Sequence, residues 1–254
     1  MRFASLGSGS RGNAHVVEAD GSRVMLDCGF HPRECERRLG RLGLQPADLA
    51  GIVVTHEHDD HVGHALPFAE RHGLRVWLTY GTWRAVRGDE LPPAWVRLID
   101  SHEAFCVGEL EVLAFPVPHD AREPVQYVFG DGMERIGVLT DIGAPTRHVI
   151  EMLSGCAALI LECNHDAQML SRGPYPAWLK SRIGGVFGHL ANEAAATLLA
   201  AIDTSRLRHI IAAHLSETNN APELARAALA GALGCGTDWI GIAEQETGFG
   251  WRDV

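Results

Sequence analysis

The stretch GIVVTHEHDDHVGH, residues 51–64, joins an apolar run rich in β-branched residues to a dense group of histidines and acidic residues. The apolar run predicts a buried strand. His56 and His58 come after it and are two residues apart, so in extended backbone their side chains leave the same side of the chain. Asp60 and His61 follow where we expect a helix to begin. Imidazole and carboxylate groups without thiolates suit zinc or manganese, so the stretch predicts a metal site at a strand end.

Short β-branched runs bounded by Gly, Pro or Asp predict a strand-rich chain with interspersed helices. Strands are expected at residues 2–7, 14–19, 23–29, 51–56, 75–80, 103–108, 110–117, 126–131, 135–141, 157–163 and 207–214. Helices are expected at residues 32–42, 60–72, 145–154, 192–202 and 221–233, the fourth with Asn192 as its N-terminal cap. This order favours an α/β fold in which two sheets pack face to face with helices outside, as one domain over residues 1–254.

The composition argues against several classes of protein. A net charge of −10 is unfavourable for a broad nucleic-acid-binding surface, which needs Lys and Arg. Arg33, Arg37, Arg38 and Arg41 are interpreted as a solvated helix face, with a local phosphate site as the alternative. No apolar run approaches the roughly 18 residues of a membrane span, and the six scattered cysteines contain no C-x-x-C pair. We therefore expect a cytoplasmic protein with reduced cysteines and no membrane partner.

The segment THEHDDH, residues 55–61, resembles the H-x-H-x-D-H motif of the metallo-β-lactamase fold superfamily, whose members share an αββα sandwich. The resemblance implies that further motif residues lie at strand ends, namely Asp27, His119, Asp141 and His214. The implied ligands of one metal ion are His56, His58 and His119, and those of a second are Asp60, His61 and His214. Asp141 then bridges both ions, and Asp27 supports the site. The implied cofactor is a pair of divalent ions, zinc or manganese.

Within the superfamily, the segments LGSGSRGNAHVVE, LECNHD, GHLANEAAA and AHLSETNN resemble the YycJ/WalJ group, which is similar to ribonucleases Z and J and is associated with DNA exonuclease activity. The resemblance implies a nucleic-acid substrate, DNA rather than structured RNA. His189 is then interpreted as a general acid, with capping of its helix as the alternative. Residues interpreted as substrate-binding are Ser8, Ser10, Asn164, His165 and Asn192. For the two serines, the glycine-rich loop 7–13 offers backbone N–H groups to an anion, and a plain tight turn is the alternative.

The reaction that follows from these groups is hydrolysis by a hydroxide that bridges two metal ions. Asp141 stands where lactam-cleaving members of the superfamily use a cysteine, which favours a phosphodiester over a lactam as substrate. The favoured function is therefore a 5′-3′ DNA exonuclease in which Asp60, His189 and Asp27 carry the chemistry. The alternatives are a carboxylic ester or thioester hydrolase of glyoxalase II type, a small cyclic-nucleotide phosphodiesterase, and a non-catalytic metal-binding protein.

Other reactive residues are interpreted as structural. His64 and the histidines without partner spacing are expected in the core or at the surface, and these are His15, His31, His72, His102, His148 and His209. Cys163 is expected to fill a buried strand. With 254 residues spent on the sandwich, the chain has no room for the inserted domain of ribonuclease J-like relatives and no Lys/Arg-rich arm like that of ribonuclease Z. We therefore expect an open site that engages a chain end.

Overall fold

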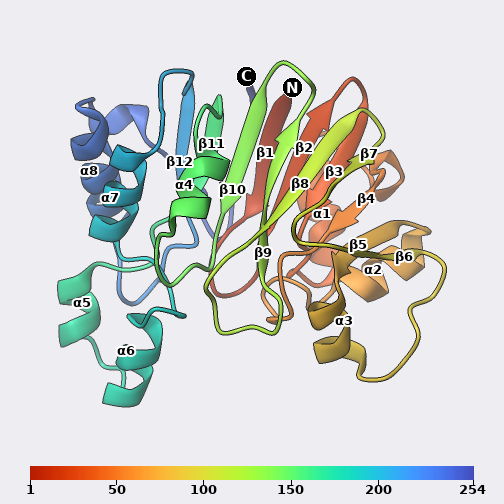
Figure 1. Cartoon of the computed structure of the whole chain (residues 1–254), viewed down its shortest axis with the longest axis horizontal. Coiled ribbons are helices and arrows are strands. Elements are labelled where there is room, and N and C mark those ends of the chain that lie inside the picture. Colours follow the sequence, from red (N-terminus) through yellow and green to blue (C-terminus); the bar gives the residue numbers. More distant parts are fainter.

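Two seven-stranded sheets pack face to face in the computed structural model, which describes residues 1–254 (Figure 1). The first sheet has the spatial order β14 (Phe249–Asp253), β1 (Arg2–Gly7), β2 (Ala14–Ala19), β3 (Ser22–Leu26), β4 (Gly51–Val53), β5 (Arg75–Thr79) and β6 (Val96–Ile99). The second has the order β13 (Gly241–Ile242), β12 (His209–Ala213), β11 (Ala158–Glu162), β10 (Arg135–Leu139), β9 (Val125–Gly130), β8 (Leu110–Pro116) and β7 (Ala104–Val107). The α/β sandwich expected from the sequence is confirmed.

Helices cover the outer face of each sheet. The first sheet carries α1 (Pro32–Arg41), α2 (Ala65–His72) and α3 (Tyr80–Arg87), and the second carries α4 (Arg147–Leu153), α7 (Asn192–Ala201) and α8 (Pro222–Leu233). Two further helices, α5 (Ala167–Arg172) and α6 (Ala177–Ile183), extend beyond the sandwich at the lower left of Figure 1. Short 3-10 turns are formed at Pro46–Asp48 and Thr237–Trp239. None of these helices has the length and apolar character that crossing a membrane requires.

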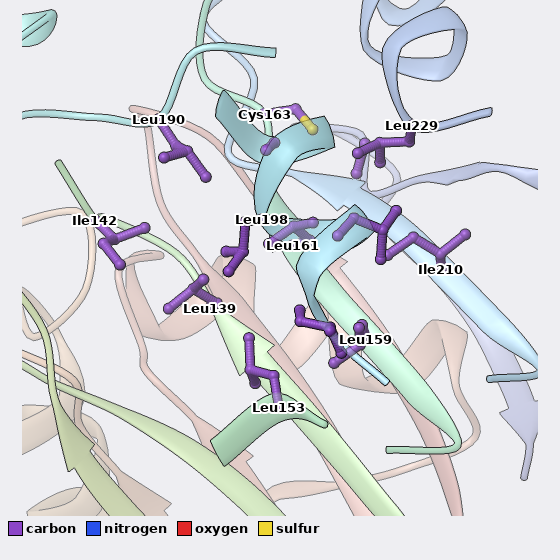
Figure 2. Close-up of a cluster of buried hydrophobic side chains, with 14 of the residues drawn as sticks. Leu139, Ile142, Leu153, Leu159, Leu161, Cys163, Leu190, Leu198, Ile210 and Leu229 are labelled. Atoms are coloured by element: carbon purple, nitrogen blue, oxygen red, sulfur yellow. The ribbon is translucent and has the colours of Figure 1, made fainter. Parts of the chain in front are cut away.

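Period-two alternation along the strands builds the layers of the core. In β11, Ala158 and Ile160 face the opposite sheet, whereas Leu159 and Leu161 pack against the helices. Figure 2 shows this outer layer, where Leu159 and Leu161 meet side chains from α4, α7 and α8. Cys163 lies in the same cluster with no exposed surface, which confirms its interpretation as strand filling, and burial raises the pKa of its thiol far above the usual range.

Six elements were not predicted from the sequence: the edge strands β6, β13 and β14, and the helices α3, α5 and α6. The C-terminal strand β14 pairs with β1, a contact between opposite ends of the chain that no local pattern reports. Helix α3 starts directly after β5, where the Thr79 hydroxyl accepts from the Thr82 N–H as an N-terminal cap. The helix expected over 60–72 begins only at Ala65, because residues 57–64 form bends and turns.

The expected solvated face of four arginines is wrong for Arg38, which is 4% exposed. Its guanidinium Nη1 donates to the carbonyl oxygens of Leu6 and Gln245, each at 2.8 Å, and its Nε donates to Glu34 at 2.5 Å. The group also lies over the ring of Phe30, with 3.9 Å from its central carbon to the ring centroid. Arg38 therefore ties β1 to the C-terminal segment and is not available to a phosphate.

His15 on β2 gives the fold a dependence on pH. The side chain is 1% exposed and neither ring nitrogen has a hydrogen-bond partner, so burial, and then the charges of His61 and His214, lower its pKa to about 3. The unfolded chain takes up a proton below about pH 6.5 and the folded chain does not. The free energy of unfolding should therefore fall by about 1.4 kcal/mol per pH unit from pH 6.5 towards 3 on account of this residue.

Urea unfolding of the metal-free protein between pH 7.5 and 5 measures this effect. Replacing His15 with leucine removes one titrating group. As the pH falls, the free energy of unfolding of His15→Leu relative to that of the wild type should therefore rise with the same slope. All other histidines titrate in both proteins and cancel in the difference. Two curves that stay parallel over this range would contradict the assignment.

Candidate metal centre

The candidate ligands gather where strands of both sheets end. Asp27 directly follows β3, His214 directly follows β12, and Glu162 is the last residue of β11. The motif residues after β4, together with His119 after β8 and Asp141 after β10, reach the same place. The carboxyl ends of neighbouring parallel strands meet at one edge of a sheet, which is where binding sites of α/β proteins form.

Three of the residues at these strand ends have left-handed backbone. The φ angles are 60° at Asp27, 52° at Asp141 and 53° at His214, and the only other non-glycine residue with positive φ is Asp20. This conformation costs a residue with a Cβ about 1–3 kcal/mol when the surroundings enforce it, and such residues cluster at functional sites. The observed strain therefore marks these strand ends independently of their chemistry.

A first group of histidines consists of His56, His58 and His119, whose ligand atoms lie within 4.8 Å of one another. His56 donates from Nδ1 to the Thr55 hydroxyl at 2.9 Å, and that hydroxyl donates to Asp27 at 3.0 Å. His119 donates from Nδ1 to the carbonyl oxygen of Gly188 at 3.0 Å. In both rings the Nε2 atom is then the one with a free lone pair, as a metal ligand requires.

A second group within the same limit consists of Asp60, His61 and His214. His61 donates from Nδ1 to Asp27 at 2.8 Å, and its Nε2 lies 2.7 Å from Asp141 Oδ2, where a binding cation would replace the proton on that nitrogen. His214 Nε2 lies 3.3 Å from Asp60 Oδ2. Asp141 lies between the two groups, because His56, His61 and Asp141 also satisfy the 4.8 Å limit. The structure thus brings together all seven predicted metal ligands, with Asp27 behind them.

The charges at this cluster suit a divalent cation. Burial alone would raise the pKa of Asp141, but the charges of His214 and His61 outweigh it and hold that pKa well below the usual range. Burial lowers the pKa of His56, which is therefore a neutral ligand. For His214 burial also lowers the pKa, but Asp141 and the hydrogen bonds to Asp60 and Glu162 raise it to about 9, so a binding cation would displace a proton there.

His56 Nε2 is buried without a hydrogen-bond partner in the protein, and the buried Asp141 Oδ2 has only the contact with His61 Nε2. A buried polar atom without a partner costs about 1–3 kcal/mol. His56 Nε2 offers a lone pair and Asp141 Oδ2 carries negative charge, so a cation between the two atoms would satisfy both. The donor set of imidazole nitrogens and carboxylate oxygens therefore fits divalent metal binding.

Glu162 is a candidate functional residue that was not predicted from the sequence. It is fully buried, and its Oε1 accepts from His189 Nδ1 at 2.8 Å and from His214 Nδ1 at 3.2 Å. Its Oε2 accepts from the backbone N–H groups of Ile142 and Leu190. Burial raises the pKa of this carboxyl, but the hydrogen bonds from His189 and His214 and the charge of His189 outweigh it and lower the pKa to about 2. The available signal was a lone acidic residue ending the apolar strand ALILE.

His189 lies beside the cluster and lines the pocket into which the cluster opens, a cavity described below. Its Nδ1 donates to Glu162 and is 3.2 Å from Asp141 Oδ1, and the ring is 23% exposed. Burial lowers its pKa, but the bonds to Asp141 and Glu162 outweigh this and raise the pKa well above the usual range. The ring is therefore held in one orientation with its Nε2 left to the pocket, because that atom makes no hydrogen bond to the protein.

Of the five residues interpreted as substrate-binding, the structure places Ser10 at the pocket and buries the other four. Ser8 donates to Asn13 at 2.8 Å and accepts from the His214 N–H at 3.0 Å. Asn164 donates to the carbonyl oxygen of His214 at 3.0 Å. Ser8 and Asn164 therefore hold the backbone of a candidate ligand and do not face the solvent.

Asn192 was expected to cap a helix or to contact substrate; it does not cap the helix, and its side chain is buried. The N-cap position belongs to Ala191, and the Asn192 amide pairs with the amide of Asn220 in two hydrogen bonds of 2.8 and 2.9 Å. His165 is 3% exposed and its Nδ1 has no partner. Both side chains lie in the protein interior behind the site.

The cluster opens into a cavity of 330 Å³. Its lining residues are Ser10, His58, Asp60, Asp120, Asp141, Tyr175, Leu179, Arg182, Ile183, Gly188, His189 and His214. The expected open site is therefore wrong in one respect, because α6 and the residues beside it form a wall of the cavity. Arg182 connects this wall to the segment that carries His119, because its Nε donates to Asp120 at 2.6 Å.

Comparison with known proteins places this geometry in context. The family model described as the β-lactamase superfamily domain matches residues 22–210. Exodeoxyribonuclease YycJ of Bacillus anthracis is 35% identical over 228 residues, which are 89% of this chain and 86% of that protein. Exodeoxyribonuclease WalJ of Streptococcus pneumoniae is 27% identical over 246 residues, covering 95% of this chain and 91% of that one. The crystal structure of the metallo-β-lactamase fold protein YhfI from Bacillus subtilis matches with a TM-score of 0.75 over 99% of both chains, at 14% identity.

Proposed function

Because the chain belongs to the metallo-β-lactamase superfamily and is a metal-dependent hydrolase, we propose that it is an exodeoxyribonuclease that removes nucleotides from the 5′ end of DNA. The observation that carries this proposal is the pairing of His189 with Glu162 beside Asp141, which sets a proton donor against the candidate metal ligands. Similarity to two exodeoxyribonucleases over most of both chains supports the choice of DNA.

In this proposal the cofactor is a pair of divalent ions, zinc or manganese. His56, His58 and His119 would hold one ion, Asp60, His61 and His214 would hold the other, and Asp141 lies where it would serve both. When bound, such ions would lower the pKa of water towards about 7 and neutralise charge on a phosphate. Asp27 orients this set through His61 directly and through His56 by way of Thr55.

The other proposed roles belong to side chains that line the cavity or lie directly behind it. His189 donates the proton on Nε2 to the leaving oxygen, and Glu162 holds the ring for that transfer through Nδ1. Ser10 is exposed at the cavity and contacts a phosphate of the substrate. Ser8, which the sequence grouped with it, acts instead by fixing the backbone of His214.

A comparison of linear and covalently closed circular single-stranded DNA of the same sequence tests the proposed function. The linear form should be degraded, with a 5′ label released before a 3′ label, and the circle should persist because it offers no terminus. Zinc-loaded and manganese-loaded protein are both assayed, and a thioester and a cyclic nucleotide serve as reference substrates. Rapid cleavage of the circle would overturn end recognition, and turnover confined to the reference substrates would overturn the nuclease assignment.

A further inference from the structure

The segment between β11 and α7 projects from the sandwich beside the metal centre (Figure 1). We call residues 167–187 the helical arm; it contains α5, α6 and the turn that leads back to His189. Tyr175, Leu179 and Arg182 of this arm line the cavity that holds the metal cluster. The proposed chemistry of hydrolysis uses none of these side chains, so the arm needs a separate explanation.

The arm exposes large apolar side chains. Trp178 is 67% exposed, Val186 is 64% exposed and Phe187 is 58% exposed. Only ten large hydrophobic residues of the chain are exposed, so three within ten positions of one another form a concentration. Exposed aromatic residues next to a functional cavity indicate a surface that binds something.

The charge of the arm is opposite to that of the protein. Residues 167–187 contain Arg172, Lys180 and Arg182 and no acidic residue, a balance of +3 within a chain of net charge −10, and of these Arg182 pairs with Asp120 outside the arm. Lys180 is the only lysine of the chain. Basic side chains interleaved with exposed aromatic rings are the features of surfaces that bind single-stranded nucleic acids, where rings stack on bases and cations meet phosphates.

The arrangement along α6 connects this surface to the cavity. Trp178 and Arg182 are four residues apart, so they share one face of the helix, and Arg182 is the member that lines the cavity. Phe187 lies two residues before His189 on the way back to the metal cluster. A strand entering the cavity therefore passes aromatic groups first and reaches the candidate ligands afterwards.

The arm is also fixed to the metal centre. Its return turn is held by the His189 N–H, which donates to the carbonyl oxygen of Ile183 at 2.7 Å, and by His119, which donates to the carbonyl oxygen of Gly188. Gly143 packs so closely against this turn that a Cβ there would overlap the backbone of Val186. The backbone of the return turn, which carries Phe187, is thus held in a set position relative to the candidate ligands.

We propose that Trp178 and Phe187 form a stacking surface for unpaired bases of single-stranded DNA, and that Arg182 and Lys180 meet its phosphates as the strand enters the cavity. This inference rests on the proposed nuclease function and names the form of its substrate. Every base has a π-face that such a surface accepts, so binding is independent of sequence. In a duplex the base faces are stacked on each other, so a duplex end is bound less well.

The test compares Trp178→Ala, Phe187→Ala and Trp178→Phe with Trp239→Ala, a matched change at an exposed tryptophan that lines a different cavity. KM and kcat are measured for linear single-stranded DNA and for a blunt duplex. Hydrolysis of bis(p-nitrophenyl) phosphate, which is too short to span the arm, normalises each variant for the state of its metal centre. Alanine at either ring should raise KM for single-stranded DNA by about 5- to 150-fold, as loss of one stacked base predicts, with kcat changed far less.

The aromatic variant Trp178→Phe should recover most of the affinity, and Trp239→Ala should behave as wild type. A KM within twofold of wild type in Trp178→Ala, or equal losses in the phenylalanine and alanine variants, would overturn the stacking surface while the nuclease function stands. Wild-type protein that hydrolyses the small ester and no polynucleotide would overturn the proposed function itself. Equal KM values for single-stranded and duplex DNA would also reject unpaired bases as the ligand.

Lys180 provides a second readout that needs no turnover. Because no other lysine is present, an amine-reactive ester modifies only this side chain and the N-terminus, and peptide mapping separates the two. Saturating single-stranded DNA should slow the modification of Lys180 and leave that of the N-terminal amine unchanged. Equal protection by duplex DNA, or none by either form, would contradict the proposed path of the strand.

Discussion

Replacing His189 with alanine should lower kcat on DNA by about 10²–10⁴-fold while the bound metal stays at the wild-type level. The reason is geometric, because Glu162 holds Nδ1 at 2.8 Å and the opposite nitrogen is left to the cavity. A side chain placed in this way delivers a proton to a leaving oxygen without being needed to retain the metal. His102→Ala, a change at an exposed histidine outside the cavity, is the matched control.

The leaving group distinguishes proton donation from a merely structural role. A sugar oxygen leaves poorly unless it is protonated, whereas p-nitrophenolate leaves readily as an anion. The loss of rate in His189→Ala should therefore be much smaller on bis(p-nitrophenyl) phosphate than on DNA. Equal losses on both substrates would contradict the role of general acid.

A loss of metal in the same variant would have a different meaning. The ligand atoms of Asp141, Glu162, His189 and His214 also lie within 4.8 Å of one another. A metal content that falls in His189→Ala would therefore place this residue among the ligands, and the proton donor would have to be sought elsewhere along the cavity wall.

The candidate ligands could be predicted from sequence because their signals are local. His56, His58, Asp60 and His61 lie within six residues, and the strand before them is recognisable from its β-branched residues. Asp27 and Asp141 each follow a strand whose end the sequence marks clearly. Neighbouring strands in register then bring these separate ends together, so a correct set of strands was enough to gather the site.

Other features depend on tertiary contacts that no local pattern contains. Glu162 is distinguished by four hydrogen bonds to residues 20 to 52 positions away, and its sequence context is only an acidic residue at the end of a buried strand. The left-handed backbone at Asp27 and His214 is likewise imposed by the surroundings. Asn164 and Asn192 have polar side chains of the kind that bind substrates. In the structure they are hydrogen-bonded in the interior, to the carbonyl oxygen of His214 and to Asn220, which are 50 and 28 residues away in the sequence.

The helical arm was missed for a related reason. Its two helices have six and seven residues, too few for a periodic apolar pattern, and Gly173, Pro174 and Pro176 between them indicate a loop. The expectation of an open site rested on the absence of a long or strongly basic insertion. The helical arm is neither long nor strongly basic, so it did not stand out as an insertion, although it forms one wall of the cavity.

Asp60→Ala should reduce the bound metal from two equivalents to one and bring DNA hydrolysis close to background. Asp60 belongs with His61 and His214, whereas His56, His58 and His119 form a group that does not include it, so this substitution removes a ligand from one group alone. A pair of ions held by these two groups would stabilise the charge that develops on a phosphate, so the loss of one ion should lower the rate strongly. Asp59→Ala is the matched control, because its exposed side chain is adjacent in sequence and absent from every ligand group.

Elemental analysis of protein loaded with zinc or manganese and freed of excess ion measures the stoichiometry. The wild type and Asp59→Ala should each hold two equivalents of metal. Asp60→Ala should keep the equivalent bound by the group that contains His119, and His119→Ala should lose that one. Because a binding cation displaces the proton that Asp141 and Asp60 hold on His214, occupation of the second position should also weaken more steeply than that of the first as the pH falls. Wild-type protein that never exceeds one equivalent, with Asp60→Ala keeping that equivalent, would reduce the centre to a single ion and remove the basis for the two-ion reaction.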